Sequence, residues 1–332
     1  MIDWQQVNAM IAASDRIILT SHENPDGDGL GSEVAIYHHL REEGKDCRII
    51  NCSDLPDEYD FLNSDNIIEM YSIDKHDDWV KDCDLAIIFD VGAFNRIRDI
   101  KNAIDKYNIK TLNIDHHPHP EDHPFTLNVV DVQAAATGVM VYDYLKEYRQ
   151  NPLTKKICEG IYTAVMTDTG NFRHSNTNAK CHEIAIECLK KGVETSKIYQ
   201  RVYETKPQSS IRLLARVIDN VTFESGGELA WFLIDQKMLD AADATSKDVD
   251  GFTDFVRSIK GVEVAVMIFE NGRDVCRINF RSKGKYVIND VAIHFGGGGH
   301  KFAAGAVIKG NKESIIPLVI SKTKASLEKQ AE

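Results

Sequence analysis

Three short apolar runs in this chain are typical of buried β-strands, and each is followed closely by acidic or histidine side chains. The runs occupy residues 16–20, 85–89 and 111–114. The polar residues that follow them are His22, Asp26 and Asp28 after the first run, Asp90 after the second, and Asp115, His116 and His117 after the third. Parallel strands carry their ligand sites at their carboxyl ends. We therefore expect these side chains, together with Asp168 farther along the chain, to converge on one spot.

The first half of the chain alternates strand and helix patterns. Helical patterns lie near residues 4–13, 29–43, 100–107 and 137–148, and further strands are predicted at 47–52 and 125–130. Such alternation is typical of an α/β fold with a parallel sheet that is covered by helices on both faces.

The length of the chain predicts two domains. Its 332 residues exceed the roughly 250 to 300 residues at which a single core stops growing. Residues 1–192 form the predicted parallel-sheet domain. Helical patterns continue to residue 220, and Pro207 interrupts them, which predicts a helical linker over 193–220. Shorter strands then return in a smaller α/β domain over 221–332, with predicted positions 229–234, 262–270, 274–281 and 304–308.

The acidic and histidine residues that follow the strands predict a metal centre. Five carboxylates and several imidazoles in one crevice would repel each other and raise each other's pKa values unless cations neutralised them. The donors are oxygen and imidazole nitrogen without thiolate, which favours Mn²⁺ or Mg²⁺ over a structural Zn²⁺. The number of donors indicates two ions. A single aspartate after a strand is more often a helix cap or a turn residue, so the prediction depends on the whole set.

Local sequence suggests how some of these groups are presented. His22, Asp26 and Asp28 share a predicted loop, whose Pro25 and two glycines, Gly27 and Gly29, permit a tight turn. Thr137 is a predicted N-cap, and a helix N-terminus that points at the cleft would add positive potential for a phosphate. Among the remaining histidines, His119 and His123 are predicted at the surface, and His174 either faces the cleft or lies in a solvated loop.

The spacing of the polar residues resembles the four motifs of the DHH phosphoesterase family, which includes RecJ-type exonucleases and family II inorganic pyrophosphatases. The matching segments are His22-x-x-x-Asp26-x-Asp28, Asp90, Asp115-His116-His117 and Asp168. A later segment, Gly-Gly-Gly-Gly-His at 296–300, resembles the signature of the DHHA1 domain. The resemblance covers nearly the whole chain and is closest to the bacterial bifunctional oligoribonuclease (nanoRNase) and pAp phosphatase group. Gly29, where many relatives have Ala, is a mild departure.

This resemblance implies that residues 1–192 are a catalytic DHH domain that holds two Mn²⁺ ions, with Mg²⁺ or Co²⁺ as alternatives. One ion would be held by His22, Asp26 and Asp90, and the other by Asp28, Asp90, His116 and Asp168. His117 would contact the phosphate and assist the leaving oxygen, and its alternative is a purely structural role. Asp115 would hold the imidazoles in place.

The resemblance also implies that residues 221–332 are a DHHA1 domain that holds the substrate. The implied substrate-binding residues are Arg281, Ser282, Gly297, Gly298, Gly299 and His300. From the residues themselves, the free amides of the glycine run could form an anion-binding nest, and a hinge or a close strand approach is the alternative. Arg281 would pair with a phosphate or stack on a base.

Charge favours short substrates over long nucleic acid. The formal net charge is −12, and residues 221–332 hold 15 basic and 15 acidic residues, so the whole excess lies in the first 220. A protein that grips long nucleic acid shows a basic footprint. We expect hydrolysis of short single-stranded RNA oligonucleotides to mononucleotides, together with phosphatase activity on 3′-phosphoadenosine 5′-phosphate (pAp). The alternatives are a c-di-AMP type cyclic-dinucleotide phosphodiesterase, a RecJ-like single-strand exonuclease, a pyrophosphatase and a non-catalytic nucleotide-binding regulator.

Sequence features also bear on location and assembly. No apolar run approaches the roughly 20 residues that span a bilayer, and the start of the chain lacks a basic segment followed by an apolar one. We expect a cytoplasmic protein with no membrane partner, and a homodimer is one expectation for its assembly. Seven cysteines without a C-x-x-C pair predict neither a disulfide framework nor a thiolate metal site.

Overall fold

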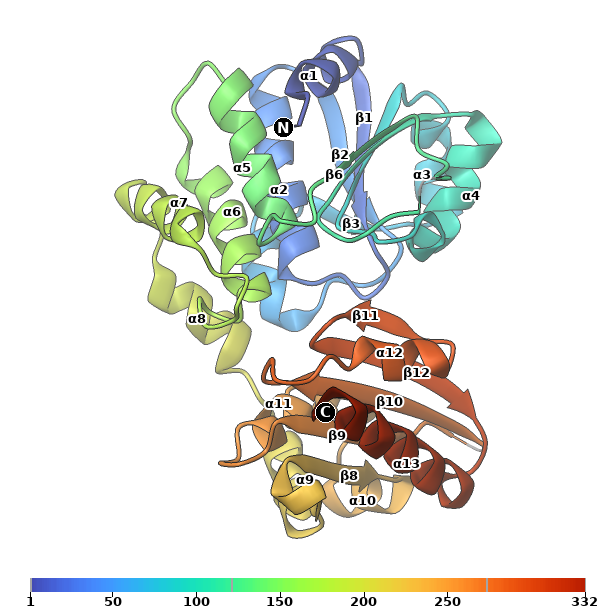
Figure 1. Ribbon diagram of the computed structural model, residues 1–332. Helices are drawn as coiled ribbons and strands as arrows, with labels where there is room; N and C mark the ends of the chain where they lie inside the picture. The colour runs from blue at the N-terminus through green and yellow to red at the C-terminus, as the bar shows by residue number, and fades with distance from the viewer. Residues whose placement is uncertain (1, 121, 273, 332) are drawn as a thin grey trace. The chain divides into compact units, whose positions relative to one another are not determined.

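The chain divides into two compact units, Met1–Thr205 and Lys206–Glu332. The computed structural model describes residues 2–120, 122–272 and 274–331 (Figure 1). Helix α8 (Thr195–Tyr203) belongs to the first unit, and helix α9 (Gln208–Asp219) belongs to the second. The helical linker over 193–220, and the domain boundaries on either side of it, stay predictions.

The first unit is built on a six-stranded sheet in which all neighbouring strands are parallel, as predicted. The strands are β1 (Arg16–Ser21), β2 (Asp46–Asn51), β3 (Ile68–Met70), β4 (Leu85–Phe89), β5 (Lys110–Asp115) and β6 (Leu127–Val130). They lie in the order β3-β2-β1-β4-β5-β6. The chain first adds β2 and β3 on one side of β1 and then adds β4, β5 and β6 on the other side. The direction in which strands are added therefore reverses at the boundary between β1 and β4. In open α/β sheets, ligands bind at the carboxyl ends of the strands at such a reversal.

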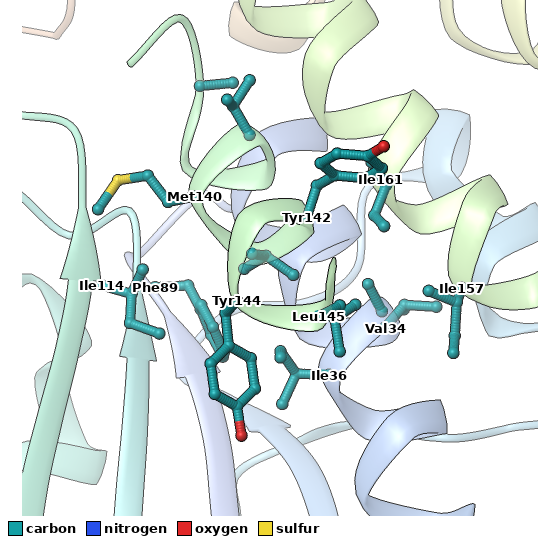
Figure 2. Packing of buried hydrophobic residues seen from close by; sticks show 14 of the residues in the cluster. Val34, Ile36, Phe89, Ile114, Met140, Tyr142, Tyr144, Leu145, Ile157 and Ile161 are labelled. Carbon is teal, nitrogen blue, oxygen red and sulfur yellow. The ribbon is translucent and has the colours of Figure 1, made fainter. Parts of the chain in front are cut away.

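Helices cover both faces of this sheet because alternate strand residues enter two separate cores. In β1, Ile17 and Leu19 belong to one core and Ile18 to the other. The larger core is covered by α1 (Trp4–Ala12), α2 (Gly27–Glu42), the 3₁₀ turn η1 (Asp57–Asn63), α5 (Thr137–Tyr148), α6 (Lys155–Asp168), α7 (Ala179–Lys190) and α8. The smaller core is covered by α3 (Ile73–Val80), η2 (Phe94–Ile97) and α4 (Arg98–Tyr107). Figure 2 shows side chains of α2, α5 and α6 packed together with Phe89 and Ile114 of the sheet.

Helices α2 and α6 cross at unusually close range because glycines face each other. A Cβ added to Gly31 would lie 2.3 Å from the carbonyl oxygen of Gly160, and one added to Gly160 would lie 2.5 Å from the oxygen of Gly31. Near the start of α2, a Cβ on Gly27 would lie 2.6 Å from the side chain of Thr167. The first turn of α2 thus meets the last turn of α6. This contact brings two predicted ligands, Asp28 and Asp168, to the same end of the helix pair.

The second unit has a mixed six-stranded sheet in the order β11-β12-β10-β9-β8-β7. Its strands are β7 (Thr222–Glu224), β8 (Leu229–Ile234), β9 (Val264–Glu270), β10 (Val275–Ser282), β11 (Gly298–His300) and β12 (Ala303–Lys309). Only β8 and β9 are parallel; the other neighbours are antiparallel. One face is covered by α9, α10 (Gln236–Ala242), η4 (Ser246–Val249) and α11 (Phe252–Arg257), and the other by α12 (Asn289–His294) and α13 (Lys312–Ala331).

Part of the glycine run forms the edge strand β11. Gly298 pairs with Gly305 of β12, and a Cβ on Gly297 would lie 2.0 Å from the carbonyl oxygen of Gly305. The amides of Gly296 and Gly297 donate to carbonyls at the end of α12. The structure therefore has the close strand approach considered above, and the anion-binding nest stays a prediction. Across the described ranges, no helix is long and apolar enough to cross a membrane.

Candidate metal centre

The first predicted ligands lie where β1 turns into α2. His22 directly follows β1 and is buried. Asp26 is the N-cap of α2, and its Oδ1 accepts the backbone N–H groups of Asp28, at 3.0 Å, and Gly29, at 3.2 Å. Asp28 therefore lies in the first helical turn and is only 1% exposed. The predicted loop is shorter than expected because the helix begins at Gly27.

The two glycines of this segment do not make a tight turn, and that prediction is wrong. Both are helical, and neither has a positive φ. Their lack of a side chain instead permits close approach, of Gly27 to Thr167 and of Gly29 to Ser21, whose Cβ lies 2.9 Å from the position of a Cβ on Gly29.

Asp90 directly follows β4, on the other side of the chain reversal. Its φ is +54°, in the left-handed region that non-glycine residues rarely adopt. Such strain costs of order 1–3 kcal/mol and persists where the surrounding structure enforces it. Here the Asp90 N–H donates to the carbonyl oxygen of Ile114 at 3.1 Å, which continues the pairing of β4 with β5. The side chain is 3% exposed.

The two oxygens of Asp90 face two different groups of donors. Oδ2 lies 3.6 Å from His22 Nε2, and Oδ1 lies 3.5 Å from His116 Nε2. His22 Nε2 is also 3.7 Å from Asp26 Oδ2. In the described residues, the groups whose donor atoms lie within 4.8 Å of one another are His22, Asp26 and Asp90; Asp28, His116 and Asp168; and Asp90, His116 and His117. One carboxylate thus lies between two donor groups.

The second donor group is centred on His116. Its Nε2 lies 3.7 Å from Asp28 Oδ2 and 3.8 Å from Asp168 Oδ2. Its Nδ1 is 3.3 Å from the carbonyl oxygen of Ala134, and the Nδ1 of His22 is 2.7 Å from the carbonyl oxygen of Glu23. A carbonyl only accepts, so in each ring Nδ1 carries the proton. Both histidines therefore direct Nε2 toward carboxylates, which is the orientation that a metal ligand requires.

The N-terminus of α5 holds Asp28. The backbone N–H of Thr137 donates to Asp28 Oδ2 at 2.7 Å, and that of Gly138 donates to Oδ1 at 2.8 Å. The Thr137 hydroxyl donates to Asp90 Oδ1 at 3.3 Å. The N-cap is Ala136, so the prediction that Thr137 caps this helix is wrong. The positive end of the helix does point at the site, where it binds a carboxylate of the protein itself.

Asp115 is fully buried and holds two histidines. Its Oδ1 lies 2.8 Å from His117 Nδ1, and its Oδ2 lies 2.6 Å from His119 Nε2. The N–H of Gly92 also donates to Oδ2 at 2.6 Å. The surface prediction for His119 is wrong, since its side chain is only 4% exposed. His123, also predicted at the surface, is half-buried beside Phe125.

Asp168 ends α6, and Asn176 fixes its position. The Asn176 amide nitrogen donates to the backbone oxygen of Asp168 at 3.2 Å, to its Oδ2 at 3.3 Å and to the oxygen of Ala135 at 2.9 Å. Sequence reasoning missed Asn176 because a lone asparagine in a loop carries no pattern. The ambiguous His174 lies in the same loop with its side chain exposed.

Burial and charge act against each other at these groups. Burial alone would lower the pKa of His22, of His116 and of His117, but the surrounding carboxylates raise each of them to about 10. Burial, with the charges of Asp90 and nearby acids, raises the pKa of Asp28 and raises that of Asp168 to about 7. Burial would also raise the pKa of Asp90, but its contacts with the three imidazoles lower it.

Divalent cations fit this arrangement. Without cations, protonated imidazoles balance the negative charge of the carboxylates. Cations between the carboxylates and each Nε2 would replace those protons. The donor atoms are carboxylate oxygens and imidazole nitrogens, which suit Mn²⁺ and Mg²⁺. Because protons and cations compete for the same atoms, cation affinity should rise with pH.

The predicted substrate residues lie in the second unit. Arg281 is on β10, where its Nε lies 3.5 Å from Asp254 Oδ2 of α11. Ser282 is buried on the opposite face of the strand, and its hydroxyl accepts the N–H of Gly284 at 3.1 Å. Gly298, Gly299 and His300 form the exposed edge strand β11. Their roles in binding stay predictions.

A buried polar network that sequence reasoning missed lies beside His22. Glu33 of α2 is fully buried, and its Oε2 accepts the Asn51 amide N–H at 2.9 Å. Asn51 Oδ1 in turn accepts the backbone N–H of Ser21 at 3.0 Å. Within the described residues, Glu33 Oε1 and the Ser21 hydroxyl have no hydrogen-bond partner. Burial raises the pKa of Glu33 from 4.5 to about 7.

The raised pKa of Glu33 predicts a pH-dependent cost to folding. Between pH 4.5 and 7 the folded state binds more protons than the unfolded state, so the free energy of unfolding falls as pH rises through this window, by about 3 kcal/mol in total. Glu33→Gln keeps an acceptor for Asn51 and removes the titration. In denaturant titrations with EDTA, we expect the variant to be more stable than the parent at pH 8 and to lose that advantage at pH 4. Exposed Glu43→Gln is the control, and an equal effect at both pH values would contradict the prediction.

Comparison with protein-family models supports the motifs seen in the sequence. Residues 16–166 match the "DHH family, N-terminal domain" model, and residues 232–325 match the "DHHA1 domain" model. The first match includes five of the six candidate ligands, all except Asp168, and the second includes β9 to β12.

Relatives and a solved structure extend the similarity over most of the chain. A Bacillus subtilis protein named "Bifunctional oligoribonuclease and PAP phosphatase NrnA" is 31% identical over 90% of this chain and 91% of its own length. A Thermus thermophilus protein of the same name is also 31% identical, over 90% of this chain and 86% of its own. The crystal structure of an exopolyphosphatase-related protein from Bacteroides fragilis matches with a TM-score of 0.91 and 26% identity, covering 100% of this chain and 99% of the other.

Proposed function

Because the chain belongs to the DHH family and carries a DHHA1 domain, we propose that it hydrolyses short oligoribonucleotides to mononucleotides and removes a phosphate from pAp. The curated relatives that bear these two activities in their names span about nine-tenths of the chain. The match includes both units, so it covers the candidate metal centre and the predicted substrate residues together. The enzyme is a hydrolase of phosphate esters.

The observation that carries this proposal is the position of Asp90 between two donor groups. The arrangement suits two divalent cations, and we propose Mn²⁺, with Mg²⁺ and Co²⁺ as alternatives. His22, Asp26 and Asp90 would hold one ion, and Asp28, Asp90, His116 and Asp168 the other. Such a pair lowers the pKa of water and stabilises the oxygens of a phosphoryl group during displacement.

The remaining side chains orient the ligands and the substrate. Asp28 is fixed by two backbone amides of α5, and Asp168 by Asn176. Asp115 binds the Nδ1 of His117 and so fixes its ring plane. We propose that His117 contacts the phosphate and gives a proton to the leaving oxygen, because its carboxylate neighbours keep it protonated.

The second unit would hold the nucleotide. We propose that Arg281 pairs with a phosphate and that β11, with Gly297, Gly298, Gly299 and His300, lines the nucleotide site. The partners are then short single-stranded RNA and pAp. A cytoplasmic location and a homodimer remain predictions.

The predicted preference for short RNA can be tested directly. With Mn²⁺, we expect RNAs of two to five nucleotides to be hydrolysed at least ~10-fold faster, in kcat/KM, than a 24-mer, because an acidic first unit offers no extended basic track to bind many phosphates. pAp should also be hydrolysed. Initial rates on this panel, with c-di-AMP added, measure the preference, and EDTA-treated enzyme is the control.

Each alternative function gives a different result on the same panel. Processive degradation of the 24-mer at an equal or greater rate would indicate a RecJ-like exonuclease. A clear preference for c-di-AMP would indicate a cyclic-dinucleotide phosphodiesterase. Hydrolysis of pyrophosphate alone would indicate a pyrophosphatase, and nucleotide binding without turnover would indicate a regulator. Reloading the EDTA-treated enzyme with Mn²⁺, Mg²⁺ or Co²⁺ shows which ion restores the rate.

A further inference from the structure

Arg277 is a half-buried cation on the face of β10 that also carries Arg281. The strand alternates strictly: Cys276, Ile278 and Phe280 enter the core beneath α12 and α13. The opposite face of the strand carries Arg277, Asn279 and Arg281, which alternate with these core residues. The two arginines are four positions apart along the strand, a distance of about 13 Å at ~3.3 Å per residue.

The environment of Arg277 gives its charge no ion pair at contact distance. Among the residues that the structure describes, Arg277 has no ion pair within 4 Å, and its Nε is buried without a hydrogen-bond partner. Its guanidinium lies 5.2 Å from the ring centroid of Phe269, which holds the side chain in place. Burial lowers its pKa, and the charge of Asp250, which forms no ion pair with it within 4 Å, acts in the opposite direction. A desolvated cation without a partner is costly, so the position would gain from an anionic ligand.

Nearby basic residues differ from Arg277 in having acidic partners. Arg281 lies 3.5 Å from Asp254, which also pairs with Arg257 at 3.0 Å. Lys312 pairs with Asp235 at 2.7 Å. A general shortage of acid in this unit therefore does not explain the unpaired Arg277.

On the β12 side of Arg277, the same face of the sheet carries small or exposed residues. Helices α9 to α11 cover the part of this face that β8 and β9 form, and α11 also packs against β10, where its Asp254 lies 3.5 Å from Arg281. On β12, the residues in register with Arg277, Asn279 and Arg281 are Val307, Gly305 and Ala303. These are small, and Val307, the largest, is 64% exposed. A row of polar side chains along β10 thus lies beside a strand whose side chains on this face are small or exposed.

We propose that Arg277 forms a second phosphate subsite, which binds the backbone of an oligoribonucleotide one or more phosphates beyond the one at Arg281. Asn279, between them, would donate or accept hydrogen bonds to the intervening nucleotide. The inference rests on the proposed function and extends it by assigning the residue that recognises substrate length. A guanidinium suits this task because its fork matches two phosphate oxygens.

The test is the dependence of binding and turnover on substrate length. For Arg277→Gln, we expect kcat/KM for a tetranucleotide relative to a dinucleotide to fall roughly tenfold, through KM, which is the scale of one charged hydrogen bond. In an Asp90→Asn background, anisotropy of a labelled tetranucleotide should show a similar rise in Kd. The slope of log Kd against log salt should decrease by ~0.7, the value for one phosphate contact on a single strand.

Two further variants make the result decisive. Lys329→Gln removes an exposed positive charge from α13, which covers the other face of the sheet, and should leave the length ratio unchanged. Arg277→Lys keeps the charge and should retain the salt slope while losing part of the affinity. Equal losses of kcat/KM on dinucleotide and tetranucleotide, or no loss on either, would leave the length ratio unchanged and would overturn the subsite. If the parent protein hydrolyses no RNA, the proposed function fails, but the anisotropy still reports on Arg277.

Discussion

Replacing Asp90 by Asn is expected to lower kcat for pAp and for a dinucleotide by at least ~10³-fold, the scale of losing one preorganised electrostatic contact at a reacting centre. Asp90 is the one carboxylate of the described centre whose two oxygens face different donor groups. An amide would present a nitrogen to one group and would remove the negative charge from both. Asn tolerates the left-handed backbone at this position, so the fold should persist.

Metal content separates this loss from unfolding. Titration calorimetry with Mn²⁺ should show weaker binding at both sites in Asp90→Asn, whereas Asp168→Ala should weaken only the site that contains His116. Exposed Asp74→Asn serves as the matched control for the change of charge. Near-parental turnover in Asp90→Asn with unchanged metal content would refute the two-cation centre.

Gly31→Ala is expected to lower the free energy of unfolding by about 2–4 kcal/mol, at or above the usual cost of overpacking a core. Two effects oppose each other here. Alanine favours a helix over glycine by up to ~1 kcal/mol. The new Cβ, however, would lie 2.3 Å from the backbone oxygen of Gly160, which cannot move without displacing α6. The steric effect should win, because the obstacle is backbone and not a flexible side chain.

The displacement of α6 should change the candidate metal centre, because the crossing of α2 and α6 sets the positions of Asp28 and Asp168. We expect thermal unfolding to shift down by about 5–15 °C and Mn²⁺ affinity to fall with it. Ser32→Ala, one residue away, is the control: the Ser32 hydroxyl is buried without a partner among the described residues, so its removal should be neutral or stabilising. An unchanged melting temperature for Gly31→Ala would show that the two helices separate easily.

The parallel sheet and the convergence of the candidate ligands could be predicted because most of these features depend on local sequence. Strands β1, β4 and β5 contain the three short apolar runs, and the residues that follow these strands meet at one edge of the sheet because of its topology. Helix α5 matched its predicted bounds of 137–148. The short strands β3, β7 and β11 were missed, since three residues show no period and glycines in β11 have no side chain to indicate strand structure.

The groups that orient the ligands could not be predicted for a different reason. His119, Asn176 and the amides of α5 act through contacts that only the folded chain creates. The hydrogen bond from Thr137 to Asp28 joins residues 109 positions apart. Nothing in the sequence around Thr137 distinguishes this contact from an ordinary helix start.

The candidate ligands come from segments that span residues 22 to 168, which is most of the first unit. The unfolded chain therefore offers no preformed site, and the free energy of cation binding becomes part of the free energy of folding of that unit. An increase in cation concentration would then raise the melting temperature of the first unit and leave that of the second unit unchanged. A cell short of the metal would hold a less stable protein, in addition to a less active one, and its proteases would remove the unloaded molecules first.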